Sequence, residues 1–185
     1  MSSEQKLANA GPLGLMGFGM TTVLLNLHNA GFFPNSSIVF SMGLFYGGLA
    51  QVIAGILESR RGNTFGTVAF VSYGFFWISL VGIWLLPVKG LAEAPSKAFM
   101  GWYLVLWGVF TLFMFLGTLK GSRVLQFVFL SLTVLFALLA LHNFLDSHLI
   151  GVIAGIVGLA CGASAMYLAM AELLHEQHGH SVLPF

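Results

Sequence analysis

The sequence predicts an all-α membrane protein with six transmembrane helices, and three observations support this fold class. Of the 185 residues, 58% are hydrophobic and only 7% are charged, whereas a soluble domain carries about 25% charged residues. Uncharged stretches long enough to cross a bilayer separate the charged residues. Turn-forming residues divide the longest of these stretches into two. We therefore expect residues 1–185 to form a single membrane domain.

The first two helices come from the long uncharged stretch between Lys6 and Glu58. A helix needs roughly 20 apolar residues to cross the ~30 Å hydrocarbon core, so this stretch is long enough for two spans. The segment 29–37, Asn-Ala-Gly-Phe-Phe-Pro-Asn-Ser-Ser, is rich in turn formers and interrupts it. We predict helices over 12–29 and 38–57.

The other four helices each occupy one uncharged stretch. These stretches run from Arg61 to Lys89, Lys97 to Lys120, Arg123 to Asp146, and Asp146 to Glu172. Each is long enough for one span, so we predict helices over 65–87, 99–119, 123–141 and 149–172.

The distribution of Lys and Arg predicts the orientation, because cytoplasmic loops carry an excess of these residues. If the amino terminus is in the cytoplasm, the cytoplasmic side holds Lys6, Arg60, Arg61, Lys120 and Arg123. The outer side then holds Lys89 and Lys97. We therefore expect a multi-pass protein of the bacterial inner membrane with both termini in the cytoplasm. The amino terminus lacks the pattern of a cleavable signal, so we expect the first span to stay in place.

Uncharged polar residues follow single faces of the predicted helices. Phe18, Thr22 and Asn26 recur every four residues in the first helix, and Gly47, Gln51 and Gly55 do the same in the second. Polar and aromatic residues also occur together in the third and fourth helices. Such faces favour a narrow path for a small polar solute. For any single Phe or Trp, however, core packing or a lipid-facing position is the better interpretation.

Histidines occur at two places. His28, His142 and His148 lie near the predicted outer ends of the helices, as interfacial polar residues or as a pH-sensitive outer vestibule. The carboxyl-terminal tail contains His175, Glu176, His178 and His180. Their spacing differs from the His-Glu-x-x-His that places two ligands one helical turn apart. We expect a solvated tail, no metal site and no cofactor.

Several glycines are spaced by four residues. They form the pairs Gly43 and Gly47, Gly151 and Gly155, and Gly158 and Gly162. Small residues at this spacing let helix backbones approach closely. The sequence leaves open whether these faces pack within one protomer or between protomers. Cys161, the single cysteine, is expected to be a small packing residue.

Several motifs together resemble those of one family. Residues 9–15, Asn-Ala-Gly-Pro-Leu-Gly-Leu, resemble the Asn-Pro-Ala-Pro-Leu-Gly-Leu signature of the succinate–acetate permeases, also called acetate uptake transporters. Asn9, Pro12, Leu13 and Gly14 match this signature, whereas residues 10 and 11 depart from it. The likeness continues at 16–22, 45–48, 62–66 and 111–115.

The resemblance implies a function and a site. It implies hexamers of six-helix protomers, each with its own central path for acetate or succinate. By the same resemblance Phe18, Tyr73 and Leu132 form a hydrophobic constriction. By the same resemblance, small carboxylates lie on either side of this ring, near Gln51, Asn63 and Thr64. The polar residues of the predicted helices add Thr22, Asn26 and Thr111 to this path.

The mechanism stays open between a proton symporter and an anion channel. Proposed partners are small carboxylates, protons, the lipid bilayer and further copies of the chain, and no nucleic acid. Two other functions remain as alternatives: a urea or amide channel with the same uncharged lining, and a membrane scaffold without transport. An enzyme is not expected, because the sequence has no Gly-x-Ser-x-Gly, phosphate-binding glycine loop or paired carboxylates within the spans.

Overall fold

The computed structural model describes residues 7–185, and every described element is helical, which confirms the predicted all-α class. Lys6 lies outside the described residues. The helices are α1 (Gly11–Asn29), α2 (Ser37–Leu44), the π-helix η1 (Phe45–Ala50), α3 (Gln51–Arg60), α4 (Thr64–Val88), α5 (Lys97–Thr118), α6 (Arg123–Leu145) and α7 (His148–His178).

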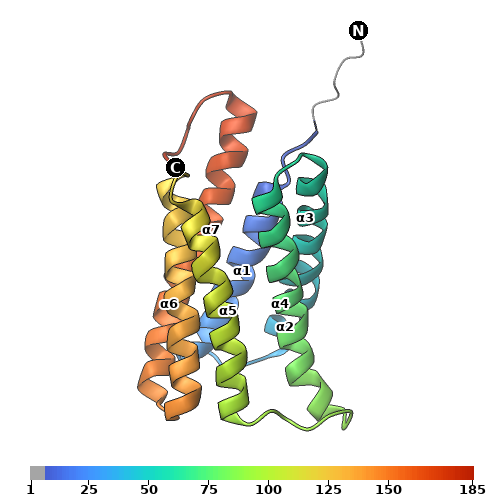
Figure 1. Cartoon of the computed structure of the whole chain (residues 1–185), viewed down its shortest axis with the longest axis vertical. Coiled ribbons are helices and arrows are strands. Elements are labelled where there is room, and N and C mark those ends of the chain that lie inside the picture. The colour runs from blue at the N-terminus through green and yellow to red at the C-terminus, as the bar shows by residue number, and fades with distance from the viewer. Residues whose placement is uncertain (1–6) are drawn as a thin grey trace.

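Successive helical segments alternate in direction along the bundle, and α2, η1 and α3 together form one of these segments (Figure 1). Both described chain ends lie at one end of the bundle, together with the turns 61–63 and 119–122. We call this the terminal end. The longer connections after α1 and α4, and the turn between α6 and α7, lie at the opposite end.

Five helical segments are long and apolar enough to cross a membrane by length and composition. They are Ser37–Arg60, Thr64–Val88, Lys97–Thr118, Arg123–Leu145 and His148–His178. Helix α1 occupies the remaining predicted range but does not reach the same apolarity. Many residues of α1 are buried against other helices. Only a small part of its surface is therefore left to face lipid, and the helix as a whole can be less apolar.

The second helical segment differs from the continuous α-helix predicted over 38–57, because its centre is the π-helix η1. Gly47 and Gly48 are buried there, against α1 and α4 respectively. A Cβ atom at Gly47 would lie 2.8 Å from Thr21 Oγ1, and one at Gly48 would lie 2.7 Å from Ile78 Cγ1. Widened helical turns of this kind are frequent at functional sites.

The last two helices are longer than predicted. Helix α6 continues to Leu145 and ends at Asp146, which adopts a left-handed conformation with φ of 51°. Helix α7 continues to His178 and ends at Gly179, where φ is 72°. A left-handed residue is a common helix stop. Much of the expected tail is therefore helical, although His175, Glu176 and His178 are exposed.

Helices α1 and α7 pack closely because glycines face each other across their interface. A Cβ atom at Gly19 would lie 2.7 Å from the carbonyl oxygen of Gly162, and one at Gly162 would lie 2.8 Å from that of Gly19. Gly155 and Gly158 meet Ala30 and Asn26 of the α1 end in the same way. These glycine faces therefore serve packing within the protomer, which decides between the two predicted alternatives for α7.

Candidate functional site

A cavity of about 130 Å³ lies between α1, α3, α4, α6 and α7 near the terminal end. Its polar lining residues are Asn9, Gln51, Glu58, Asn63 and Glu172. Its apolar lining includes Leu15, Phe18, Phe70, Tyr73, Leu125, Val128, Phe129 and Leu132. An apolar cavity of about 150 Å³ in another protein holds benzene, so this space suffices for a small carboxylate.

Three of the lining residues are the predicted constriction. Phe18, Tyr73 and Leu132 come from α1, α4 and α6, and each is buried. The rings of Phe18 and Tyr73 lie 5.9 Å apart between centroids. The structure therefore brings these three side chains together at one cavity, and Phe129 packs against the ring of Tyr73 beside them.

Tyr73 carries the only hydroxyl group of this ring of three residues. Its hydroxyl donates to Thr111 Oγ1 at 2.9 Å, and Thr111 in turn donates to the carbonyl oxygen of Trp107 at 2.7 Å. Thr111 is thus buried behind Tyr73 and does not line the cavity. The hydroxyl hydrogen of Tyr73 is therefore used in the bond to Thr111 of α5. The hydroxyl oxygen can still accept a hydrogen bond from a solute.

Gln51 is the first residue of α3, directly after the π-helix, and its side chain lines the cavity. It is 1% exposed, and its Oε1 atom has no hydrogen-bond partner in the described structure. A buried polar atom without a partner costs about 1–3 kcal/mol. Gln51 is therefore suited to a hydrogen-bonding solute that enters the cavity.

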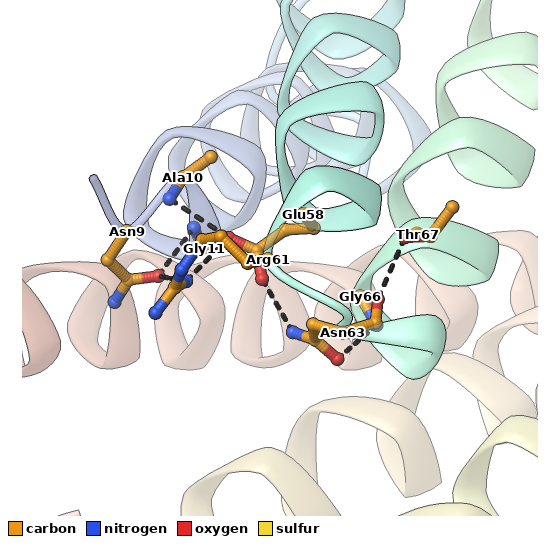
Figure 2. Close-up of polar contacts among 8 residues, drawn as sticks. All are labelled: Asn9, Ala10, Gly11, Glu58, Arg61, Asn63, Gly66 and Thr67. Carbon is orange, nitrogen blue, oxygen red and sulfur yellow. Dashed lines mark hydrogen bonds and ion pairs between the residues drawn. The ribbon is translucent and has the colours of Figure 1, made fainter. Parts of the chain in front are cut away.

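Glu58 lies at the polar end of the cavity and is fully buried. Figure 2 shows the three donors around it. Its Oε1 accepts from the backbone N–H of Ala10 at 3.0 Å and from Arg61 Nη1 at 2.8 Å, and its Oε2 accepts from Asn63 Nδ2 at 2.6 Å. This carboxylate joins the start of α1, the end of α3 and the start of α4.

Asn9, Arg61 and Asn63 complete the polar cluster around Glu58. Asn9 Oδ1 accepts from Arg61 Nη1 at 2.6 Å and from the N–H of Gly11 at 3.0 Å. Asn63 caps α4 by accepting from the N–H of Gly66 at 3.0 Å. In the sequence, Glu58 lies just beyond a predicted helix and has no predicted role, because spacing alone does not show which side chains meet at helix ends.

Glu172 of α7 lines the same end of the cavity. Its carboxylate lies against Gly11, because a Cβ atom there would be 3.1 Å from Glu172 Oε2 and 3.1 Å from Asn9 Oδ1. No ion pair joins Glu172 to another described residue. The sequence analysis used Glu172 only as the end of a span.

Comparison with known proteins identifies the family. All residues, 1–185, match the GPR1/FUN34/yaaH family. The chain belongs to this family.

Two relatives and one solved structure illustrate the range of the GPR1/FUN34/yaaH family. The chain is 65% identical to the succinate-acetate/proton symporter SatP of Escherichia coli K12, over 97% of this chain and 95% of that protein. It is 35% identical to ammonia transport outward protein 2 of Saccharomyces cerevisiae, over 97% of this chain and 67% of that protein. The solved structure of the bacterial acetate channel SatP has 64% identity and a TM-score of 0.96, with 97% of this chain and 99% of that chain covered.

These relatives bear on the predicted class of protein. The suspected resemblance to the succinate–acetate permeases is confirmed, since the similar proteins include a succinate-acetate/proton symporter. Together with the apolar helices, membership of the GPR1/FUN34/yaaH family makes this chain a multi-pass membrane protein.

The residues of the family signature start α1. Asn9 lines the cavity and belongs to the polar cluster around Glu58. Pro12 is buried in the first turn of α1. A proline is tolerated there because backbone N–H groups of the first turn have no partner within the helix. Leu13 is exposed on the outer surface, and Gly14 lies against Phe70, where a Cβ atom would be 2.5 Å from the ring.

The remaining predicted path residues lie away from the cavity. Thr22 and Asn26 are buried in α1, where Asn26 Nδ2 donates to the carbonyl oxygen of Thr22 at 2.9 Å. Asn26 packs against Gly158 of α7. Thr64 is exposed at the start of α4 and does not line the cavity.

The three histidines share a second cavity of about 400 Å³ at the opposite end of the bundle. Its lining includes His28, His142 and His148. Nδ1 of His28 pairs with the carbonyl oxygen of Phe33 at 3.0 Å, and Nδ1 of His142 pairs with that of Ser147 at 2.8 Å. A carbonyl oxygen only accepts, so Nδ1 is the donor in both pairs.

A search of residues 7–185 for three or more His, Cys, Asp or Glu side chains able to hold one metal ion finds no such group. Cys161 is fully buried in α7, and its thiol lies 3.5 Å from the carbonyl oxygen of Val128.

Proposed function

We propose that this chain transports acetate and related small carboxylates, succinate among them, across the bacterial inner membrane. The observation that carries the proposal is the cavity at the terminal end, which joins the apolar ring of Phe18, Tyr73 and Leu132 to a polar end. Identity of 65% to a protein named as a succinate-acetate/proton symporter supports the substrate class.

The physical role of the ring follows from the cost of desolvation. An anion in an apolar constriction loses hydration that few donors there replace. A hydrophobic ring therefore acts as a gate, and polar groups such as Gln51 and Asn9 supply partial rehydration next to it.

Uptake of labelled acetate into proteoliposomes tests the proposal. The wild type is expected to take up acetate in competition with succinate, while urea does not compete. The Leu132→Ala variant removes one wall of the ring, so we expect larger carboxylates to enter faster relative to acetate. Vesicles without flux would support a scaffold, and competition by urea would support an amide channel.

The orientation and assembly form the second part of the proposal. The terminal end carries four described basic residues, Arg60, Arg61, Lys120 and Arg123, against Lys89 and Lys97 at the opposite end. This bias favours a cytoplasmic terminal end. Six crossings agree with it, because both described chain ends lie at the terminal end. We also propose a homo-hexamer, as the family resemblance implies; size-exclusion chromatography with light scattering measures it.

A further inference from the structure

The polar end of the cavity has an unusual charge balance for a carboxylate path. Its lining contains the two acids Glu58 and Glu172, and no Lys or Arg. The nearby cation Arg61 is already engaged by Glu58 and Asn9. A carboxylate anion that enters this space therefore meets two like charges at close range, where low dielectric strengthens repulsion.

Of the two acids, Glu58 is built to stay ionised. Both of its oxygens accept hydrogen bonds, from Ala10 N–H, Arg61 and Asn63. Hydrogen bonds to the charged form of a carboxyl group favour that form. Protonation of Glu58 would also disrupt the junction of α1, α3 and α4, so it is a fixed charge.

Glu172 has different surroundings. It is partly exposed, lies against Gly11, has the side chain of Asn9 as its hydrogen-bonding neighbour and makes no ion pair with a described residue. The charged groups that act on it from the packed elements are Glu58 and Arg61. On α7 itself, Glu176 and His175 follow it and are exposed.

The side chain of Gln51 is a second, independent observation that points to a polar ligand for this cavity. It is 1% exposed, lines the same space as Glu172, and its Oε1 has no hydrogen-bond partner. An amide side chain offers N–H groups to a carboxylate and an acceptor oxygen to water.

We propose that Glu172 binds one proton whenever a carboxylate anion occupies the cavity, so that binding of the two is linked. This inference rests on the proposed transport function. An O–H bond forms on Glu172 with a proton from the water at the terminal end, and no bond in the acetate breaks. The bound state then keeps the charge of the empty cavity, because one proton arrives with one anion.

Acetate binding to the purified, detergent-solubilised protein tests the proposal by isothermal titration calorimetry in buffers of different ionisation enthalpy. For the wild type at pH 7 we expect one proton taken up per acetate, and an apparent Kd that rises tenfold per pH unit in alkaline buffer. The Glu172→Gln variant should take up none and bind with little pH dependence. The Glu172→Asp variant should restore the proton uptake.

Glu176→Gln is the matched control, because Glu176 lies one turn further along the same helix and does not line the cavity; it should behave as the wild type. Unchanged proton uptake in Glu172→Gln would overturn the proposal and show that acetic acid enters in its protonated form. Absence of proton uptake in the wild type would overturn it as well. A wild type that binds no acetate would contradict the proposed function instead.

An infrared difference spectrum of the wild type tests the same step without a variant. Addition of acetate labelled with ¹³C should produce the carbonyl band of a protonated, unlabelled protein carboxyl group. A band shifted by the label would place the proton on the acetate and contradict the role of Glu172.

Discussion

At the scale of single residues, the hydrogen bond of Tyr73 defines what its hydroxyl contributes. The donor is directed to Thr111, away from the cavity that the ring lines. The hydroxyl of Thr111 in turn donates a hydrogen bond to the carbonyl oxygen of Trp107. The bond therefore fixes the position of the constriction relative to α5.

Removal of either partner of this bond should have the same consequence. We expect Tyr73→Phe and Thr111→Val each to lower acetate flux and to cost about 1 kcal/mol of stability. The double variant should be no worse than the single ones, since the same interaction is lost. Flux in proteoliposomes and thermal unfolding measure both effects; additive losses would mean that the Tyr73 hydroxyl also contacts the solute.

The cavity at the opposite end has three imidazole rings in its lining. His28, His142 and His148 carry N–H groups, which donate hydrogen bonds to carboxylates. Asp146 near His142 stays ionised, because the hydrogen bond from Lys97 lowers its pKa.

We therefore expect replacement of all three histidines by Ala to slow acetate uptake. The measurement is initial uptake into vesicles with the opposite end outward. Equal rates for the variant and the wild type would show that these histidines are only interfacial polar residues.

At the scale of elements, the contact between α1 and α7 depends on the absence of side chains. Gly158 lies against Asn26, which is fully buried, and a Cβ atom at Gly158 would be 2.1 Å from Asn26 Cγ. Neither helix can move away without opening the interface at Gly19 and Gly162.

Gly158→Ala should accordingly destabilise the protein by about 1–3 kcal/mol through overpacking. The matched control is Gly82→Ala in α4, because a Cβ atom at Gly82 has no neighbour within 4 Å. Thermal unfolding in detergent compares the two, and equal midpoints would contradict this account of the interface.

At the scale of the whole molecule, the proposed orientation can be measured with thiol chemistry. Cys161 is the only cysteine and is fully buried, so it gives little background labelling. Glu93 is exposed at the opposite end and Ser181 at the terminal end.

An impermeant thiol reagent added to intact spheroplasts should label the Glu93→Cys variant at once. The Ser181→Cys variant should react only after the membrane is opened. The reverse pattern would place the terminal end outside the cell.

Much of the architecture was predictable from local properties of the chain. Apolarity and charge spacing are summed along the sequence, so the all-α class and the approximate positions of the helical segments follow from them. The exact ends of the helices were not predictable, because the left-handed residues Asp146 and Gly179 end α6 and α7 through their backbone conformation. The π-helix was missed for a similar reason: it depends on where Gly47 and Gly48 meet other helices.

The sequence by itself determined the helical membrane class and, through its motifs, the family. The family resemblance also predicted a ring of Phe18, Tyr73 and Leu132. Only the tertiary structure decided which side chains share a space. It moved Thr111 behind Tyr73, left Thr64 on the surface, and brought Glu58 and Glu172 to one cavity. Periodicity gives the face of each helix but not its partner, and packing between distant segments sets the partner.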